Sequence, residues 1–225
     1  GESACAGALR EANEEAGVPE AAVRPRVMSV LDIGIWTYST LVADVVTPFE
    51  PVISDPESVE LEWVPVADVT KRPLHPGFAD SWAHLRELLA FRPAVVVDAA
   101  NVVGSVPDGW WKDRAGAAER LLGEVAAQAG TGVPAPALEL PADTWFPEWV
   151  VVLEGAARAA HDVAPVETVR ASGEGDDEIF AQAERLVAAG RPVTVVTSDR
   201  ALAERVRDAG AAVRGARWLR DVLGR

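Results

Sequence analysis

The sequence predicts a two-domain chain of the α/β and α+β classes, whose second domain is a doubly wound, mainly parallel sheet with helices on both faces. Three observations support this prediction. The chain has 225 residues, enough for two ordinary domains. Its composition, 49% hydrophobic and 25% charged, is typical of globular proteins. After Arg92-Pro93, short apolar runs alternate with helical segments, which predicts domains at residues 1–92 and 93–225.

The composition also limits the classes of function. A net charge of −14 argues against a general nucleic-acid coat, because phosphate binding requires lysine and arginine. No apolar run approaches the length of a membrane span, and no basic-then-apolar signal is visible. Cys5 is the single cysteine, which excludes an intramolecular disulfide. We therefore expect a cytoplasmic protein without a membrane partner, and the oligomeric state stays open.

A helix is predicted in the stretch before Gly17, which is placed to end it in the left-handed conformation. Glu11, Glu14 and Glu15 stand at i, i+3 and i+4, so three carboxylates share one helix face. Like charges at this spacing repel each other. The face is therefore either solvated or neutralised by a divalent cation.

The same stretch carries a resemblance to a known family. Glu2, seven residues and then REANEEAGV resemble the Nudix box. The resemblance implies a partial Nudix α/β/α fold and a pyrophosphohydrolase whose nucleotide substrate is a nucleoside diphosphate linked to a group X. Glu11, Glu14 and Glu15 would then bind Mg²⁺ or Mn²⁺ and act in catalysis. Arg10 would pair with Glu14 or Glu15 and belong to the substrate-binding residues. Because the leading glycine of the box would precede residue 1, we expect that some N-terminal strands of this domain are missing.

The rest of the first domain is predicted to contain three strands. Residues 26–35 and 37–46 read as two strands joined near Gly34, followed by a proline-rich loop over residues 48–56. Residues 59–64 alternate as a half-buried strand would, with Val59 and Trp63 on one face and Glu60 on the other. The segments LEWVPVADV and PLHPGFADSW, with a helix through Phe91, resemble the closing part of Nudix domains. Glu60 is therefore a candidate metal ligand, or else simply the solvent side of an edge strand.

The second domain is predicted as alternating strands and helices. Buried or partly buried strands are expected at residues 94–97, 149–153, 166–169, 193–196 and 211–213. Helices are expected at residues 113–128, 177–189, 200–209 and 218–223, and a proline-rich loop at residues 131–147. This order favours a parallel sheet with helices on both faces.

Acidic side chains follow several of these strands. Asp98, Glu154 and Asp199 stand at strand ends, and Asp176 and Asp177 open a helix at the same predicted edge of the sheet. Ligands of such sheets bind beyond the carboxyl ends of the strands. Carboxylates gathered there are unfavourable unless cations neutralise them, and Mg²⁺ or Mn²⁺ suits all-oxygen ligands. Taken singly, each acid also fits an ordinary helix cap.

The segments VVVDAANVVGS, GEGDDEI and VTVVTSDRALAERVRDAGAAV resemble the NYN branch of the PIN-like nucleases, and specifically its YacP-like members. The resemblance implies an endoribonuclease in which Asp98, Asp176 or Asp177, and Asp199 hold metal. Asn101 and Ser198 would orient a carboxylate or phosphate. The family pattern usually has Asp in place of Glu154, and Gly-Tyr in place of Ala99-Ala100. These departures leave room for altered or lost activity.

Two further groups of residues bear on nucleic-acid binding. Lys112 and Arg114, beside Trp110 and Trp111, could contact and stack on single-stranded RNA, or the aromatics could simply pack beside a solvated turn. Residues 200–225 contain seven arginines against three acids, a net charge of +4. This end either binds phosphates or is the solvated side of terminal helices.

Several other functions are not supported by the motifs. No G-x-G-x-x-G follows the first strand of the second domain, no P-loop is present, and the three histidines and one cysteine offer no zinc spacing. Alternatives to a hydrolase stay open. The Nudix part could be an inactive remnant that serves as a binding or assembly module for a metal-dependent RNase, or the chain could bind metal and nucleotide without catalysis.

Overall fold

The computed structural model describes residues 1–225 except residues 33, 55, 57, 108 and 225. Ile33, Asp55 and Arg225, which belong to a predicted strand, a predicted loop and the basic end, lie outside the described residues. The chain forms two compact units: unit 1 is Gly1–Ala90 with Pro134–Trp145, and unit 2 is Phe91–Val133 with Phe146–Arg225. The domain boundary at residues 92 and 93 stays a prediction.

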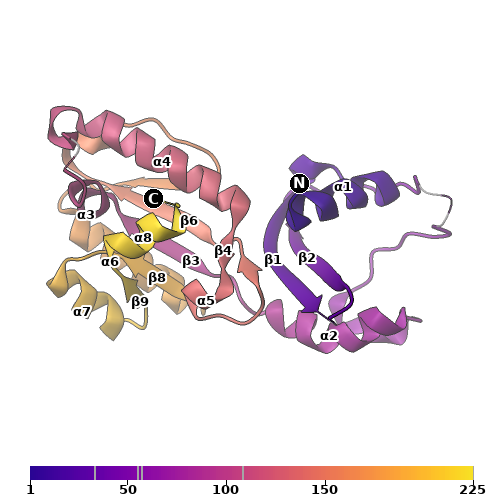
Figure 1. The fold of residues 1–225 in the computed structure, drawn as a ribbon. Coiled ribbons are helices and arrows are strands. Elements are labelled where there is room, and N and C mark those ends of the chain that lie inside the picture. Colours follow the sequence, from indigo (N-terminus) through magenta and orange to yellow (C-terminus); the bar gives the residue numbers. More distant parts are fainter. Residues whose placement is uncertain (33, 55, 57, 108, 225) are drawn as a thin grey trace. The chain divides into compact units, whose positions relative to one another are not determined.

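Unit 1 combines helices with a sheet in which β1 pairs antiparallel with both of its neighbours (Figure 1). The glutamate-bearing helix α1 (Ala4–Ala16) begins at Ser3, whose Oγ accepts the N–H of Ala6, and ends at Gly17 in the left-handed conformation, as predicted. The strands β1 (Val23–Asp32) and β2 (Thr37–Val45) form a long antiparallel hairpin. The 3-10 helices η1 (Glu20–Ala22) and η2 (Val66–Lys71) and the helix α2 (Pro76–Leu88) complete the first ninety residues.

The strand predicted at residues 59–64 is wrong. The structure has no strand there, and the side chains of the predicted buried face, Val59 and Trp63, are 92% and 58% exposed. Trp63 instead makes an edge contact with Phe49, and the neighbouring Glu62 forms an ion pair of 2.5 Å with Arg72. An alternating pattern forms a strand only where it pairs with another strand, and residues 59–64 pair with none of the described strands, although β2 lies at the edge of its sheet.

The proline-rich segment after residue 131, predicted as a loop, contains two short strands that belong to the sheet of unit 1. These are β4 (Val133–Pro134) and β5 (Thr144–Trp145), which give the sheet the order β2-β1-β5-β4. The short helix α5 (Ala135–Leu138) lies between them in the sequence. Trp145 is fully buried and pairs with Val27 of β1, and the carboxylate of Asp143 accepts the N–H of Val30 at 2.7 Å.

Unit 2 alternates strands and helices largely as predicted. Its strands are β3 (Ala94–Asp98), β6 (Glu148–Leu153), β7 (Glu167–Arg170), β8 (Val193–Val196) and β9 (Ala212–Arg214). Its α-helices are α3 (Ala99–Gly104), α4 (Arg114–Thr131), α6 (Gly175–Ala188), α7 (Arg200–Asp208) and α8 (Ala216–Val222), with 3-10 helices η3 (Trp110–Lys112) and η4 (Gly155–Ala159). The sequence did not predict α3.

The five strands form one sheet of order β7-β6-β3-β8-β9, and the described neighbouring pairs are all parallel. The chain runs outward from β3 to β6 and β7, and then returns to the other side of β3 to form β8 and β9. The direction of winding therefore reverses between β3 and β8. In sheets of this kind, this reversal opens a crevice at the carboxyl ends of the two strands.

Two layers of helices cover the sheet of unit 2 (Figure 1). Val96 of β3 and Val195 of β8 share a buried cluster with Ile179 of α6 and Leu202 of α7. The helices α3 and α4 pack together and against β6, and α8 packs on α3. The predicted α/β and α+β classes are therefore confirmed. Among the helices that the structure describes, none has the length and apolar run needed to cross a membrane.

Candidate functional site

The carboxyl ends of three central strands in unit 2 present polar side chains on one face of the sheet. Asp98 ends β3, Glu154 follows β6, and Thr197 follows β8. Because side chains alternate along a strand, Asp98 lies on the same face as Val96, and Thr197 on the same face as Val195. This is the face that α6 and α7 cover. The three side chains thus meet where these two helices begin, beside the crevice between β3 and β8.

Asp98 is the buried centre of this group, with 7% of its surface exposed. One carboxylate oxygen accepts the N–H of Asn101 at 3.0 Å and so caps α3, and the other accepts the hydroxyl of Thr197 at 2.9 Å. Burial raises the pKa of Asp98, its two hydrogen bonds lower it, and the charges of Asp176 and Glu154 raise it further. The carboxylate is therefore rigidly held in a site with a surplus of negative charge.

Asp199 and Ser198 are tied to the same strand ends. The Asp199 carboxylate caps α7 by accepting the N–H of Leu202 at 2.8 Å, while its own N–H donates to the Thr197 hydroxyl at 3.1 Å. The N–H of Ser198 donates to the side-chain oxygen of Asn101 at 3.0 Å. Asn101 thus fixes the backbone after β8, and its predicted role in orienting a carboxylate or phosphate stays a prediction. Thr197 was not predicted as a site residue, although a polar residue in phase with Val195 is a readable signal.

Asp176 and Asp177, the two alternatives for one predicted metal ligand, have different surroundings in the structure. Burial, followed by the charges of Asp199 and Glu154, raises the pKa of Asp176. Glu154 thus raises the pKa of both Asp98 and Asp176, and the positive charge of Arg205 lowers that of Asp176. Asp177, by contrast, forms an ion pair of 2.9 Å with Arg205, and its side chain is 78% exposed. Asp176 is the aspartate of this pair that the fold brings to the acidic edge.

Glu154 reaches the beginning of α6, where its carboxylate accepts the N–H of Gly175 at 2.9 Å. A Cβ atom added at Gly175 would lie 2.6 Å from this carboxylate, so only glycine leaves room for the contact. The longer glutamate, found where the NYN pattern usually has aspartate, is thus used to span from β6 to α6. We call Asp98, Glu154, Asp176 and Asp199 the acidic edge.

The chemistry of the acidic edge suits Mg²⁺ or Mn²⁺, because its donors are all carboxylate oxygens and a cation would offset their mutual repulsion. In the part of the chain that the structure describes, however, no three His, Cys, Asp or Glu side chains lie close enough to hold a metal as they stand. The two findings are compatible. Charge repulsion acts over longer distances than metal–oxygen bonds of about 2.0–2.6 Å. The donors share one edge but do not form a preassembled ligand set.

Lys112 and Arg114 have no hydrogen bond or ion pair to the acidic edge among the described residues. Arg114 lies over the ring of Trp110, 5.3 Å from its centroid, and the rings of Trp110 and Trp111 meet edge to face. Trp111 is 56% exposed. The arginine is therefore engaged with an aromatic ring, and its predicted role in substrate binding stays a prediction.

In unit 1, the predicted catalytic glutamates are exposed on α1, which contains no buried residue. Arg10 organises most of them. Its guanidinium contacts the carboxylates of Glu14 at 2.7 Å, Glu2 at 3.2 Å and Glu11 at 3.5 Å. Of the two partners predicted for Arg10, the structure selects Glu14. The positive charge of Arg10 offsets the repulsion that the spacing of the glutamates creates.

Among the described residues, the side chains of Glu15 and Glu60 do not form an ion pair with Arg10. The carbonyl of Glu15 accepts the N–H of Ser54 at 3.2 Å, and that of Ala16 accepts the N–H of Val52 at 3.0 Å, so the loop after β2 closes the end of α1. Glu60 is exposed in the irregular segment after this loop. Its assignment as a metal ligand stays a prediction, without the strand on which it was placed.

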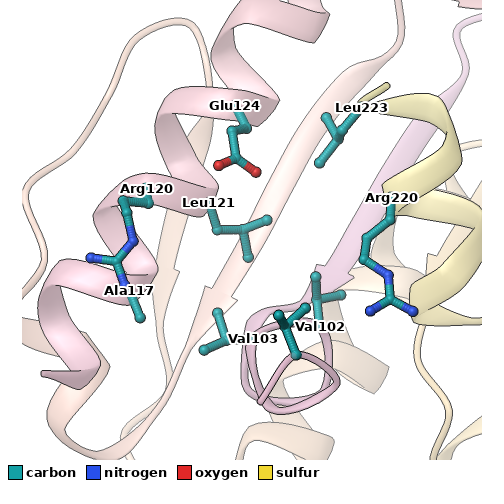
Figure 2. Close-up of a pocket in the computed structure, with 9 residues that line it drawn as sticks. Val102, Val103, Ala117, Arg120, Leu121, Glu124, Arg220 and Leu223 are labelled. Carbon is teal, nitrogen blue, oxygen red and sulfur yellow. The ribbon is translucent and has the colours of Figure 1, made fainter. Parts of the chain in front are cut away.

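A pocket in unit 2 lies between α3, α4 and α8 (Figure 2). Arg220 reaches into it from α8 and donates to the carbonyl of Ser105 at 3.3 Å. Its lining is otherwise apolar except for Arg120 and Glu124, and comprises Val102, Val103, Val106, Ala117, Arg120, Leu121, Glu124, Arg220 and Leu223. None of the predicted site residues lines it, so the acidic edge is the better candidate site.

The fold and the two sets of acids define a chain with a glutamate-bearing helix in unit 1 and an acidic parallel-sheet edge in unit 2. No family model matches the chain. Among curated proteins, it is 41% identical over 97 residues to the "Putative 8-oxo-dGTP diphosphatase 3" of Mycobacterium tuberculosis strain CDC 1551 / Oshkosh, an alignment covering 40% of this chain and 44% of that protein. It is 37% identical over 84 residues to the "Nucleoside triphosphate pyrophosphatase/Nudix hydrolase fusion protein" of Bifidobacterium longum, covering 36% of this chain and 17% of that protein.

The chain thus spans less than half the length of the curated relatives it matches. Among solved structures, it is similar to the crystal structure of Rae1 (YacP) from Bacillus subtilis, with a TM-score of 0.44 and 22% identity, over 59% of this chain and 75% of that one. The resemblance to Nudix hydrolases recognised in the sequence is confirmed as a similarity to these curated relatives.

Proposed function

We propose that the chain is a metal-dependent hydrolase of phosphorus esters and anhydrides, with the acidic edge of unit 2 as an endoribonuclease site. The observation that carries this proposal is the convergence of Asp98, Glu154, Asp176 and Asp199 at the winding reversal of a parallel sheet. Burial there, and then the charges of neighbouring acids, raise the pKa of Asp98 and Asp176. These residues would hold Mg²⁺ or Mn²⁺, and the ion would polarise the oxygens of a phosphodiester. The buried Asp98 would be the most firmly positioned ligand.

Asn101 and Ser198 would support this site by holding its strand ends in place. Their mutual hydrogen bond joins α3 to the end of β8, so the strand ends that carry Asp98 and Asp199 keep a fixed separation. Fixed positions matter because small displacements of catalytic groups greatly reduce rates. The exposed hydroxyl of Ser198, which accepts only a long bond of 3.4 Å from Ala216, would remain available to a substrate phosphate.

For unit 1 we propose a Nudix-type pyrophosphohydrolase activity on a nucleoside diphosphate linked to X. The spacing of Glu11, Glu14 and Glu15 supports it, and so do the relatives, one named for 8-oxo-dGTP and one for nucleoside triphosphates. A nucleoside triphosphate is such a compound, with phosphate as X. The glutamates would hold Mg²⁺ or Mn²⁺, with Arg10 keeping their helix face in order.

The endoribonuclease is tested on the whole chain with end-labelled single-stranded RNA and Mn²⁺. Asp98→Asn should reduce cleavage at least about 100-fold. Asp208→Asn is the matched control, because Asp208 is an exposed aspartate at the far end of α7 and should leave the rate unchanged. Equal cleavage by wild type and Asp98→Asn would contradict the proposal.

The pyrophosphohydrolase is tested separately with Mg²⁺ and a panel of nucleoside triphosphates and nucleoside diphosphate derivatives. Glu14→Gln should abolish turnover, whereas Glu20→Gln, an exposed glutamate outside the motif, should not. Calorimetric Mn²⁺ binding without hydrolysis of any nucleotide or RNA would instead favour a binding module, the alternative that the loose placement of the ligands supports.

A further inference from the structure

Two arginines flank the acidic edge on the side of β8 and β9. Arg200 is the first residue of α7 and directly follows Asp199. Arg217 is the second residue of α8 and follows Ala216, whose N–H donates to the hydroxyl of Ser198 at 3.4 Å. The backbone there is held close to the end of β8, because the N–H of Thr197 donates to the carbonyl of Arg214 at 2.9 Å. Both arginines therefore lie at the sheet edge that carries the acids.

The two arginines approach this edge from different helical layers. α7 belongs to the layer with α6, where Leu202 is fully buried, while α8 packs with α3 and α4 around the pocket of Figure 2. In an α-helix the Cα–Cβ bond tilts toward the N-terminus. Side chains in the first turn of α7 and α8 therefore lean toward the sheet edge from which both helices start. Arg200 and Arg217 can thus extend beside the acidic edge from two sides.

Neither arginine is engaged elsewhere. Both are exposed, and within the described ranges neither forms an ion pair or a side-chain hydrogen bond. Of the neighbouring arginines, Arg205 pairs with Asp177 and lies over the ring of Phe180, and Arg220 binds the carbonyl of Ser105. Arg207 is exposed like Arg200 but lies further along α7, away from the sheet edge. The position of Arg200 and Arg217 at the edge that carries the acids, without a partner among the described residues, leaves both guanidinium groups free to contact one anionic ligand there.

We propose that Arg200 and Arg217 form a clamp for the phosphates of single-stranded RNA, placing the strand across the ends of β8 and β9 beside the acidic edge. The inference rests on the proposed endoribonuclease and specifies its substrate-binding surface. A guanidinium group binds phosphate oxygens through two parallel hydrogen bonds, which a flexible strand accommodates at successive phosphates. The clamp also offsets the repulsion between the RNA backbone and Asp98, Asp176 and Asp199.

The test measures binding of a fluorescein-labelled 12-nucleotide single-stranded RNA to the whole chain by anisotropy, in EDTA and across a salt series. Each phosphate contact adds about 0.7 to the magnitude of the slope of log K against log salt for single strands. Arg200→Ala and Arg217→Ala should each weaken binding several-fold and reduce the slope by about 0.7. Arg207→Ala is the matched control, since Arg207 is exposed on the same helix about 10 Å further along its axis.

Slopes that are equal in wild type, Arg200→Ala and Arg217→Ala would overturn the clamp, as would the same loss of slope in Arg207→Ala. Absence of RNA binding by the wild type would also overturn it. Asp98→Asn separates the clamp from the nuclease: it should lose cleavage in Mn²⁺ but keep the salt slope measured in EDTA. If Asp98→Asn cleaves normally while the arginine variants lose slope, the nuclease site fails and the clamp stands.

Discussion

The hydroxyl of Thr197 donates a hydrogen bond of 2.9 Å to the carboxylate of Asp98, which lies 99 residues earlier in the chain. The same hydroxyl oxygen accepts the N–H of Asp199 at 3.1 Å. One threonine thus joins the ends of β3 and β8 and links two members of the acidic edge. Its hydrogen bond to Asp98 also lowers the pKa of that carboxyl, against the effect of burial.

Thr197→Val keeps the shape of this buried side chain and removes its hydroxyl. We expect a loss of about 1–3 kcal/mol in unfolding free energy, because Asp98 and the N–H of Asp199 lose a partner in a buried setting. The pKa of Asp98 should rise further, so the acidic limb of the pH–rate profile for RNA cleavage should move to higher pH. Thr197→Ser, which retains the hydroxyl, should restore both. An unchanged pH profile in Thr197→Val would contradict the positioning role.

Gly175→Ala tests the contact between β6 and α6. The new Cβ would lie 2.6 Å from the Glu154 carboxylate, which ends a flexible side chain and can turn away. We therefore expect a small cost, about 1 kcal/mol of stability, but a clear loss of Mn²⁺ affinity in calorimetry. Gly173→Ala is the control, because nothing lies within 4 Å of the added Cβ there. Equal affinities in the two variants would exclude Glu154 as a ligand.

Asp176→Asn should stabilise unit 2 near neutral pH. The raised pKa of Asp176 means that the folded state holds this proton more tightly than the unfolded state. The contribution of Asp176 to the free energy of unfolding is therefore greatest at low pH and is lost as pH rises through the raised pKa. Asparagine carries no charge, so the variant does not lose this free energy as pH rises. The substitution also breaks no hydrogen bond among the described residues, because Asp176 forms none there. We expect a melting temperature about 2–4 °C higher at pH 7 and unchanged at pH 3.

The neighbouring variant Asp177→Asn provides the comparison. It removes an exposed ion pair with Arg205, which is worth at most about 1 kcal/mol, and should lower the melting temperature slightly or not at all. Thermal unfolding between pH 3 and pH 7 distinguishes the two. If both variants shift the melting temperature equally, Asp176 does not face the other acids.

Arg26→Ala should strongly destabilise unit 1. The buried guanidinium pairs with Asp44 at 3.1 Å and donates to the carbonyl of Leu89, so it joins β1 to β2 and to the end of α2. Breaking a buried pair leaves an uncompensated charge and costs about 3–5 kcal/mol. Chemical denaturation measures this loss, and Arg24→Ala, an exposed arginine on the same strand, should cost less than about 0.5 kcal/mol. Similar losses in the two variants would contradict the role of Arg26.

The elements that the sequence predicted best are those whose residues all favour the same local structure. β8 matches residues 193–196 as predicted, because a short β-branched run bounded by Pro192 and Thr197 has few alternatives. The end of α1 at Gly17 follows from local capping in the same way. Residues 59–64 show the limit of such patterns, because alternation without a strand partner leaves Val59 92% exposed.

The acidic edge could be predicted in part. The positions of Asp98, Glu154 and Asp199 could be predicted, because each follows a predicted strand and parallel strands align their carboxyl ends. The choice between Asp176 and Asp177 depends on which way the first turn of α6 faces, and Thr197 depends on β8 lying next to β3. Long-range packing decides strand order and helix rotation. The phase of Thr197 with Val195 therefore indicates the face on which it lies, but not that its partner is Asp98.

The sheet of unit 1 is completed by residues 134–145, which come after more than forty residues of unit 2. On the ribosome, β1 and β2 therefore emerge long before Trp145, which is buried against Val27. During synthesis, the edge of β1 that pairs with β5 therefore stays unpaired until much of unit 2 has been made. The sheet of unit 1 can therefore be completed only after residues 91–133 of unit 2 have been synthesised. Cleavage of the chain at residue 93 would place the strands of this sheet on two different fragments.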